Sequence, residues 1–340
     1  MKAIQIKEYG GSDTLGLAEV PEPEPGEGEA LIKIAYAGVN FIDVYMRDGV
    51  FRKLETYPNK PPFTPGMEGT GVVEAIGPGV TEVVEGDAVG YCLEVGSYAQ
   101  YAVVPVWKLV KVPADVPMDI ATALQLQGMT AHYLTHSLFP LAEGHTCLIH
   151  AGAGGMGQLA IQLAKMRGAR VIVTVGSPEK AEIAKQRGAD HAILYRDVDF
   201  ADAVLDLTDG VGADVVYDSV GKDTIKGSLK CLKSRGVLSN NGNASGPIGA
   251  LDPLDLAEAG SVFFTRPHLA SYIPTAEVRA ERSDDLYRLY LDGKLTVTID
   301  RTLPLADAKA AHDAMEGRQS KGKMLLEVDA VLFNPEKPFI

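Results

Sequence analysis

The sequence predicts an α/β protein in which a doubly wound parallel sheet is joined to a β-rich part. Two sections of the 340-residue chain differ in their pattern of predicted secondary structure. Short β-branched stretches lie between proline- and glycine-rich turns before about residue 115, and strands alternate with helices after about residue 145. A glycine-rich turn at 152–157 follows the first strand of that alternation. Because one domain holds roughly 100–200 residues, the length fits two domains.

The first part of the chain is expected to form short strands. They are predicted at 30–35, 71–76 and 99–104, where β-branched and apolar residues predominate. Clusters of proline with glycine at 21–26 and 61–66 separate such stretches and predict turns. The pattern is typical of a β-rich domain.

The second part is expected to repeat a strand–helix unit. A helix at 156–167 is ended by Gly168, and a second helix begins with Ser177 as its N-cap and Pro178 in its first turn and ends at Gly188. Repeated units of this kind predict a parallel sheet with right-handed crossovers. The strands are expected at 146–150, 170–175, 191–194, 214–217 and 236–239.

The alternation ends near residue 265. Beyond it, the sequence predicts a helix at 284–291, a strand at 296–299 and a helix at 306–316. The last residues, 331–340, contain two prolines and are expected to form a tail.

Composition limits the classes of partner. The chain holds 32 Lys and Arg against 45 Asp and Glu, a formal charge of −13, which argues against nucleic acid or an anionic membrane as the main partner. No secretory signal and no apolar run long enough to cross a membrane is recognised, so a cytoplasmic protein is expected. The three cysteines form no CxxC pair, which excludes a cysteine-built structural zinc site.

The strongest motif is the glycine-rich turn. It follows an apolar strand and opens a helix, which is the context that the dinucleotide-binding fingerprint requires. Glycines there allow a tight turn and a close approach of the backbone to a pyrophosphate at the helix N-terminus. The alternative is a plain strand-to-helix turn. The residues that match the motif are Gly152, Gly154, Gly155, Met156 and Gly157.

The end of the next strand indicates which dinucleotide is bound. NAD sites usually carry an acid there to hold the ribose hydroxyls, and an acid would repel the 2′-phosphate of NADP. Here Gly176 and Ser177 follow the strand, and Lys180 lies one helical turn further on. This favours NADP. The alternative is that Ser177 is only a helix cap and Lys180 only a solvated side chain, although capping and phosphate binding are compatible.

A set of ordered motifs extends over nearly the whole chain, from residue 1 to about 328. With it, the sequence resembles the medium-chain dehydrogenase/reductase superfamily, in the quinone oxidoreductase branch that includes zeta-crystallin. Any single match carries little weight, whereas the ordered set is specific. The matching segments are 37–45, 65–73, 86–90, 127–131, 217–221, 242–243 and 265–267.

The resemblance implies a fold and an organisation. It implies a Rossmann doubly wound sheet inserted into a GroES-like β-rich domain, with an active cleft between the two. The expected parts are a GroES-like catalytic domain at 1–124, a Rossmann NADPH-binding domain at 125–267, and a return to the catalytic domain at 268–340 that includes the tail. Homo-oligomers are usual in the family, and a dimer is expected here.

The chain departs from the zinc-dependent alcohol dehydrogenases of that superfamily. Asn40 stands at the place of a cysteine ligand, Met67 at the place of a histidine ligand, and the structural-zinc loop is reduced to 90–101. A thioether is a poor zinc ligand beside thiolate or imidazole, and both zinc sites are lost, so no metal is expected and Glu68 is expected to be structural. Without a Lewis acid, quinones or activated enones are favoured over simple ketones as acceptors.

The resemblance also implies roles for individual residues. Asn40, Asp43 and Tyr45 are expected near the nicotinamide and the acceptor, with Tyr45 bonding a quinone oxygen or donating a proton, and Arg266 is expected to reach the same cleft. The alternative is that 39–45 is only a helix start and that the others, Tyr195 and Lys323 above all, are surface or packing residues. The expected cofactor-binding residues, beyond the five of the glycine turn, are Phe41, Thr130, Tyr133, Gly176, Ser177, Lys180, Tyr195, Ser219, Asn241, Gly242, Asn243 and Lys323.

The function expected from all of this is a zinc-independent, NADPH-dependent quinone oxidoreductase. A first alternative is an NADPH-dependent reductase of α,β-unsaturated carbonyls, including enoyl-CoA-type substrates, with Tyr45 as proton donor. A second is a crystallin-like NADPH-binding protein with little catalysis. The His132 and His136 pair is not expected to bind metal because no further ligand motif surrounds it. His150 and Cys147 are expected to be buried structural residues.

Overall fold

The computed structural model describes residues 1–52 and 60–329. Internal contacts divide the chain into two compact units: unit 1 comprises residues 1–126 and the chain from 273 onward, and unit 2 comprises Gln127–Tyr272. Each is described by itself below. The tail expected at 331–340 lies outside the described residues.

Unit 2 is built on a six-stranded sheet whose neighbouring strands are all parallel. The strand order is β10-β9-β8-β11-β12-β13, so the chain reverses its direction of travel between β8 and β11. The sequence-based expectation of a doubly wound sheet is confirmed. The strands are β8 (Thr146–Ile149), β9 (Arg170–Val175), β10 (His191–Leu194), β11 (Ala213–Asp218), β12 (Leu232–Asn240) and β13 (Phe263–Thr265).

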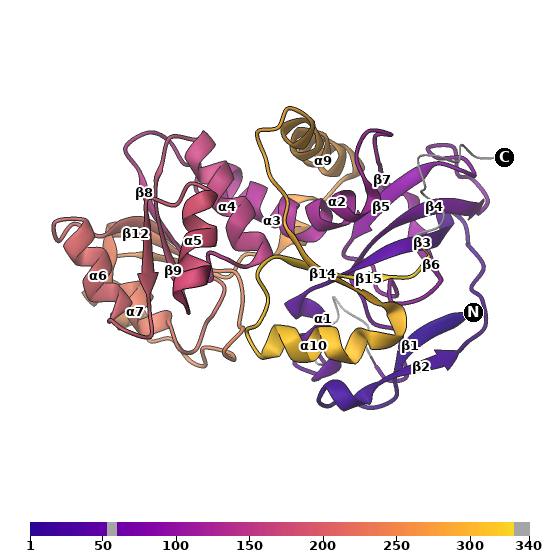
Figure 1. Cartoon of the computed structure of the whole chain (residues 1–340), viewed down its shortest axis with the longest axis horizontal. Helices are drawn as coiled ribbons and strands as arrows, with labels where there is room; N and C mark the ends of the chain where they lie inside the picture. The colour runs from indigo at the N-terminus through magenta and orange to yellow at the C-terminus, as the bar shows by residue number, and fades with distance from the viewer. Residues whose placement is uncertain (53–59, 330–340) are drawn as a thin grey trace. The chain divides into compact units, whose positions relative to one another are not determined.

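Helices cover both faces of this sheet. Figure 1 shows α4 and α5 on one face and α6 and α7 on the other, the arrangement that right-handed crossovers impose. Gly168 and Gly188, with φ of 80° and 102°, end α4 and α5 as expected. The helices are α3 (Met129–Tyr133), α4 (Gly155–Met166), α5 (Pro178–Gln186), α6 (Phe200–Leu207), α7 (Ile225–Lys230) and α8 (Pro253–Glu258).

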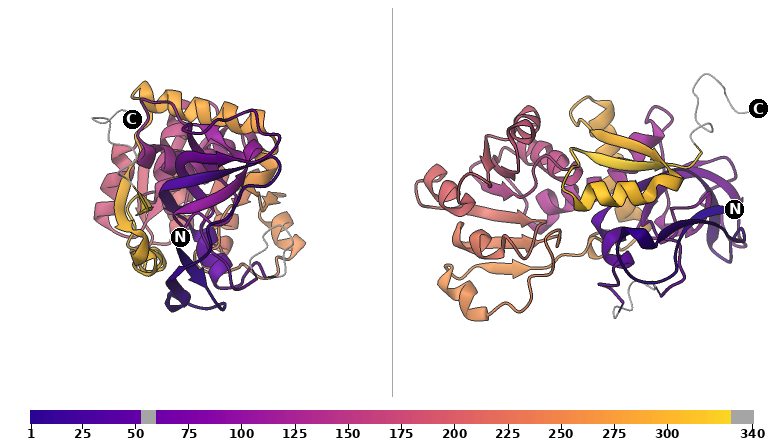
Figure 2. Two further views of the ribbon diagram at one scale, coloured as in Figure 1. Left: turned by 90° about the vertical axis from the view of Figure 1, so that its right-hand side faces the viewer. Right: turned by 60° about the horizontal axis from the view of Figure 1, so that its bottom comes forward.

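Unit 1 is built on an antiparallel-rich sheet in the order β14-β15-β3-β4-β5-β7, with β6 paired to β3. Strand β15 lies antiparallel to β3, so the two ends of the chain build one sheet (Figures 1 and 2). A separate pair, β1 (Lys2–Ile6) and β2 (Leu15–Glu19), is also antiparallel. The sheet strands are β3 (Glu29–Val39), β4 (Glu68–Ile76), β5 (Ala88–Cys92), β6 (Tyr101–Pro105), β7 (Val110–Lys111), β14 (Ile299–Pro304) and β15 (Lys323–Glu327).

Four helices pack with this sheet, and two of the C-terminal elements differ from expectation. The helices are α1 (Phe41–Arg47), α2 (Met118–Ala123), α9 (Ala276–Leu291) and α10 (Ala308–Glu316). Helix α9 begins eight residues before the predicted 284 because its first half is polar and lacks an apolar period, although the Thr275 side chain accepts from Val278 N and marks the start. The strand predicted at 296–299 is wrong, since β14 begins at Ile299, where pairing with β15 starts. Pairing rather than β-propensity sets that boundary.

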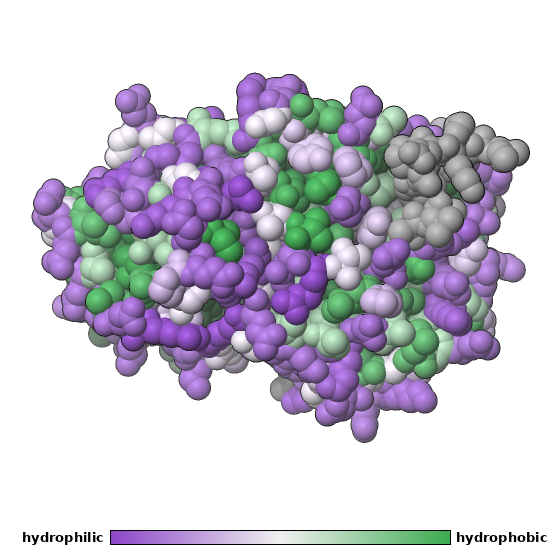
Figure 3. Space-filling view, in the orientation of Figure 1, coloured by the Kyte–Doolittle hydropathy of each residue, from purple (hydrophilic) through white to green (hydrophobic). Residues whose placement is uncertain are grey.

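The face of the molecule drawn in Figure 3 is largely polar. Hydrophilic side chains cover most of the face in Figure 3, and hydrophobic groups form small, separate patches. No helix within the described residues combines the length and the apolar character needed to cross a membrane.

Candidate active site

The turn between β8 and α4 is held tightly by two of its glycines. A Cβ at Gly152 would lie 2.6 Å from Cβ of Val173 on β9, and one at Gly157 would lie 2.5 Å from the carbonyl oxygen of Ala151. Both distances are too short for any other residue. The last glycine of the motif therefore lets α4 pack closely on the turn, as expected for a dinucleotide site.

Gly154 is different. It is the N-cap of α4, no side chain caps the helix there, and a Cβ at Gly154 would meet only the Ala151 carbonyl oxygen, at 3.3 Å. A Cβ at Gly154 would thus meet no side-chain atom within 4 Å. Unpaired backbone N–H groups and the positive end of the helix dipole make such a terminus suited to a phosphate group.

The ends of β9 and β10 meet beside this turn. The Ser177 side chain accepts from Lys180 N at 3.3 Å and caps α5. A Cβ at Gly176 would lie 2.8 Å from the Tyr195 hydroxyl, so Tyr195 after β10 lies directly against the strand end. Tyr195 is 37% exposed, and Gly176, Ser177 and Lys180 are half-buried. The structure brings these four predicted residues to one edge.

A buried hydrogen-bond network ties β8 to β11 at their carboxyl ends. Asp218 accepts from Ser228 Oγ at 2.9 Å and from the backbone of the next turn, and Ser228 Oγ lies 3.0 Å from His150 Nε2. The Thr174 hydroxyl lies 2.8 Å from His150 Nδ1. Burial lowers the pKa of His150, so it is the neutral ring that links the strands. His150 is a buried histidine with both ring nitrogens engaged, as expected, and it lies after β8, next to the point at which the strand order reverses.

The loop after β12 approaches the loop after β11. A Cβ at Gly242 would lie 2.5 Å from the Ser219 carbonyl oxygen, so only glycine fits there. The side-chain oxygen Oδ1 of Asn241 is buried and has no hydrogen-bond partner among the described residues. An orphaned buried acceptor at the carboxyl edge of the sheet fits a ligand that carries N–H groups, such as a carboxamide. Asn243 lies in the same loop.

Three further predicted residues lie just after β13 or on α3. The Arg266 guanidinium donates to the carbonyl oxygen of Asn240, at the end of β12, at 2.9 Å. The Tyr133 ring stacks on Tyr272, with centroids 4.2 Å apart, and burial raises the pKa of Tyr133. Thr130 is half-buried on the same helix. Tyr133 thus has a protein ring on one face already.

In unit 1, the start of α1 is fixed by a buried carboxylate. Asp43 Oδ2 accepts from the Asn40 backbone N–H at 2.8 Å and from the Tyr98 hydroxyl at 3.2 Å. Burial raises the pKa of Asp43 to about 7, although the bonds from Asn40 N and Tyr98 and the charge of Lys323 lower it. Asp43 is fully buried within unit 1.

Lys323 takes part in a buried polar cluster. Its ammonium is ion-paired with Glu68 Oε2 and donates to Asn40 Oδ1 at 2.8 Å. Asn40 Nδ2 in turn donates to Glu68 Oε2 at 2.8 Å, and Leu126 N donates to Glu68 Oε1 at 2.5 Å. A Cβ at Gly38 would overlap both the Glu68 carboxylate and the Lys323 ammonium. Glu68 is fully buried and holds three groups of this cluster, which agrees with the structural role expected for it.

Two of the predicted site residues, Asn40 and Lys323, belong to this cluster. Lys323 was expected to bind the cofactor, but its side chain is 1% exposed and is directed to Glu68 and Asn40. Asn40 is itself 3% exposed. Both side chains are thus held inside unit 1, and their roles toward cofactor and acceptor stay predictions. The spacing of these residues along the chain gave no signal of the cluster, because Lys323 and Glu68 are 255 positions apart.

Aromatic rings gather on and after α1. The ring of Tyr45 lies 6.0 Å from that of Phe41 and 5.7 Å from that of Phe51, in an edge-on arrangement with the latter. All three residues are half-buried. Such rings form a surface on which a flat ring compound can pack.

The sequence did not single out three buried polar residues behind α1: Arg47, Tyr98 and His312. The one available signal was His312, a polar residue among alanines in the predicted helix 306–316, at the helical spacing of its buried face. Within residues 1–52 and 60–329, no group of three or more His, Cys, Asp or Glu side chains is arranged to hold a metal ion. Met67 is buried.

A parallel six-stranded sheet with a glycine turn at its reversal point defines a dinucleotide-binding oxidoreductase domain. The family comparisons agree with this class. Residues 155–272 match the family described as zinc-binding dehydrogenase, and residues 26–114 match the alcohol dehydrogenase GroES-like domain. The chain belongs to the medium-chain dehydrogenase/reductase superfamily, in its quinone oxidoreductase family.

Three relatives cover nearly the whole chain. A 2-haloacrylate reductase from a Burkholderia species is 42% identical over 95% of this chain and 98% of its own length. A quinone oxidoreductase from Pseudomonas aeruginosa is 40% identical over 96% of this chain and 99% of its own length. The solved structure of Escherichia coli quinone oxidoreductase in complex with NADPH is 35% identical, with a TM-score of 0.93 and coverage of 96% and 100%. The resemblance inferred from the motifs is confirmed.

Proposed function

We propose that this protein is a zinc-independent quinone oxidoreductase that uses NADPH. The observation that carries the proposal is the group of Gly176, Ser177, Lys180 and Tyr195 beside the open N-terminus of α4. A cation and two hydroxyls at the end of β9 suit a 2′-phosphate. The Escherichia coli relative, solved with NADPH, supports the same cofactor.

Residues of unit 2 hold the cofactor in this proposal. The N-terminus of α4 beside Gly154 takes the pyrophosphate, and the Ser177 hydroxyl and Lys180 ammonium take the 2′-phosphate. Asn241 Oδ1, buried and without a partner among the described residues, accepts from the carboxamide of the nicotinamide. When bound, NADPH supplies the hydride.

Residues of unit 1 serve the acceptor. The aromatic rings of Phe41, Tyr45 and Phe51 provide a packing surface for a planar quinone, and the Tyr45 hydroxyl donates to one quinone oxygen. A quinone that takes one hydride and one proton becomes a hydroquinone, so it needs a hydrogen-bond donor at its oxygen. Asn40, Asp43 and Lys323 act by holding the first turn of α1, which carries Tyr45.

The donor set of this site does not suit zinc. The two positions that provide thiolate and imidazole in zinc-dependent relatives hold Asn40 and Met67 here. The Asn40 amide is engaged with Glu68 and Lys323, and the Lys323 ammonium already supplies the positive charge beside Glu68. Amide and thioether donors next to a fixed ammonium are unsuited to Zn²⁺.

A second candidate reaction is the reduction of an activated carbon–carbon double bond. The 42% identity to a 2-haloacrylate reductase favours it. In that reaction the hydride goes to one carbon and a proton to the other, so a proton donor must reach carbon, and Tyr45 is the candidate. The same residues would therefore serve either acceptor, a flat quinone or a small unsaturated acid.

The test compares acceptors with the purified protein in the presence of EDTA. Oxidation of NADPH and of NADH is followed with 1,4-benzoquinone, 9,10-phenanthrenequinone, 2-chloroacrylate and a simple enone. Quinone turnover with NADPH that EDTA leaves unchanged supports the proposal. Turnover restricted to 2-chloroacrylate or the enone moves the assignment to double-bond reduction, and loss of activity in EDTA contradicts the zinc-free mechanism. Tight NADPH binding with no turnover indicates the crystallin-like alternative.

A further inference from the structure

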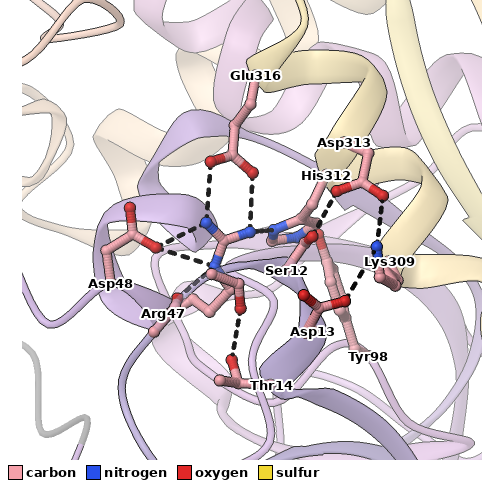
Figure 4. A network of polar contacts seen from close by, with 12 residues as sticks. Ser12, Asp13, Thr14, Arg47, Asp48, Tyr98, Lys309, His312, Asp313 and Glu316 are labelled. Carbon is pink, nitrogen blue, oxygen red and sulfur yellow. Dashed lines mark hydrogen bonds and ion pairs between the residues drawn. The ribbon is translucent and has the colours of Figure 1, made fainter.

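Behind α1, a row of buried polar side chains runs from the far end of that helix to Asp43. Arg47 Nη1 lies 3.2 Å from His312 Nδ1, His312 Nε2 lies 3.2 Å from the Tyr98 hydroxyl, and that hydroxyl donates to Asp43. Figure 4 shows the Arg47 end of this row, with His312 and Tyr98 beyond the guanidinium. All four side chains are buried. None of them is used in the reaction proposed above except Asp43, as a support.

The chemistry of the donors gives the row a direction. A guanidinium has only N–H groups to offer, so His312 Nδ1 must accept from Arg47. Burial first, and then the charge of Arg47, lower the pKa of His312 to about 3, so its ring is neutral and its one proton lies on Nε2. That proton points to the Tyr98 oxygen. The Tyr98 hydroxyl is therefore left to donate its own proton to Asp43 Oδ2.

The row is anchored at its outer end. Arg47 donates two bonds to the Glu316 carboxylate, at 2.9 and 3.0 Å, and two to Asp48, at 2.6 and 3.0 Å (Figure 4). Both carboxylates are partly exposed, whereas the Arg47 side chain is 1% exposed. A guanidinium clamped by two carboxylates has no freedom to turn away from His312.

The inner end needs such a support. Asp43 Oδ2 receives the Asn40 N–H and the Tyr98 hydroxyl, while Oδ1 has no hydrogen-bond partner among the described residues. The charged groups that act on this carboxyl are Lys323, which favours its ionised form, and Glu68, which opposes it. A buried carboxylate with one bare oxygen depends strongly on each donor that remains.

We propose that Arg47, His312 and Tyr98 form a directed hydrogen-bond chain that holds the Asp43 carboxylate on the Asn40 N–H and so positions the first turn of α1. Arg47, His312 and Tyr98 are positioning residues. Their effect on turnover rests on the proposed function, whereas their effect on Asp43 does not. This hydrogen-bond chain joins three elements that are distant in sequence: the end of α1, the segment after β5 that holds Tyr98, and α10. The hydrogen-bond chain thus connects Asp43 to the partly exposed carboxylates of Asp48 and Glu316 on unit 1.

The test measures the titration of Asp43 directly. Protein labelled with ¹³C at the aspartate carboxyl carbons is titrated by NMR, and the Asp43→Asn variant identifies the signal. Burial raises the pKa of Asp43 to about 7, within the range where the folded protein can be studied. Tyr98→Phe removes only one hydroxyl, a donor to the charged form, so the midpoint is expected to rise by about one to two pH units.

Two substitutions at His312 test the direction of the chain. A glutamine accepts from Arg47 through its oxygen and donates to Tyr98 through its nitrogen, so His312→Gln keeps both bonds and is expected to leave the Asp43 midpoint unchanged. His312→Leu keeps neither bond and is expected to raise the midpoint, by less than Tyr98→Phe. An unchanged midpoint in Tyr98→Phe, or equal midpoints in the glutamine and leucine variants, would overturn the proposal.

Kinetics give a second measurement on the same variants. With a quinone acceptor, Tyr98→Phe is expected to lower kcat roughly tenfold because the first turn of α1 is less well held, while the KM for NADPH, which unit 2 binds, stays within about twofold. A loss in NADPH affinity with kcat unchanged contradicts the positioning role. If the unmodified protein reduces no acceptor, the proposed function fails. The NMR titration then still tests whether the hydrogen-bond chain supports the Asp43 carboxylate.

Discussion

The ammonium of Lys323 and the carboxylate of Glu68 form an ion pair with side-chain exposures of 1% and 0%. Removing one partner leaves the other charge buried and unpaired, which costs about 3–5 kcal/mol. We expect Lys323→Met and Glu68→Gln each to lower the free energy of unfolding by about that amount. The double variant is expected to lose much less than the sum. Urea unfolding of the four proteins measures this, and strictly additive losses would show that the pair is not coupled.

Gly38 leaves room for that ion pair. A Cβ there would overlap the Glu68 carboxylate and the Lys323 ammonium, so Gly38→Ala is expected to cost about 2–3 kcal/mol. Gly16 on β2 is the matched control, because a Cβ at Gly16 meets nothing within 4 Å. Gly16→Ala is expected to change the stability by about 0.5 kcal/mol or less. Equal losses in the two variants would mean that the cluster adapts to an added methyl group.

Alanine substitutions at two glycines of the turn at 152–157 are expected to affect different properties, stability in one case and cofactor affinity in the other. Gly157→Ala places a Cβ against the Ala151 carbonyl oxygen and is expected to cost about 2–3 kcal/mol of stability. Gly154→Ala meets only one atom, at 3.3 Å, and is expected to cost about 1 kcal/mol or less. It places a methyl group in the proposed phosphate site, so NADPH affinity, measured by fluorescence titration, is expected to fall roughly tenfold or more. Unchanged affinity in Gly154→Ala would move the phosphate site elsewhere.

The choice between NADPH and NADH is expected to depend on Lys180. Lys180→Met keeps the aliphatic stem and removes the charge, so the affinity for NADPH is expected to fall roughly tenfold while that for NADH stays the same. Lys185→Met on the same helix is the control, since Lys185 is exposed in the last turn of α5. If the affinities for NADPH and NADH fall together, Lys180 contacts a part that the two cofactors share and does not recognise the 2′-phosphate.

Sequence patterns predicted five of the six strands of unit 2 to within four residues, and β13 was not predicted. Buried parallel strands such as β8 and β9 are continuous apolar runs, and Ser177 and Gly188 mark the bounds of α5 by local chemistry. Strand β14 was misplaced because its start depends on pairing with β15, which no local pattern encodes. The roles of the individual site residues, and the expected homodimer, stay predictions.

The part of the site that could not be predicted is the part made by tertiary contacts. Asn40 and Asp43 lie three positions apart, and motif matching found both of them. The groups that hold them, Tyr98, His312 and Lys323, lie between 55 and 283 positions away from their partners. A buried histidine or lysine has no sequence signature that separates a positioning role from a ligand-binding role, so burial and bond direction had to come from the structure.

Stability in acid is expected to depend on His312. Burial and the charge of Arg47 lower its pKa to about 3 from an ordinary value of 6.5. Between these values the unfolded chain binds a proton that the folded protein does not, so His312 makes the free energy of unfolding fall as the pH drops, by about 1.4 kcal/mol per pH unit. We expect His312→Gln, which cannot be protonated, to lack this dependence. Urea unfolding at several pH values gives the difference between the two proteins, in which the other titrating groups cancel. Parallel curves between pH 6.5 and 3 would show that His312 is protonated in the folded protein as readily as in the unfolded chain.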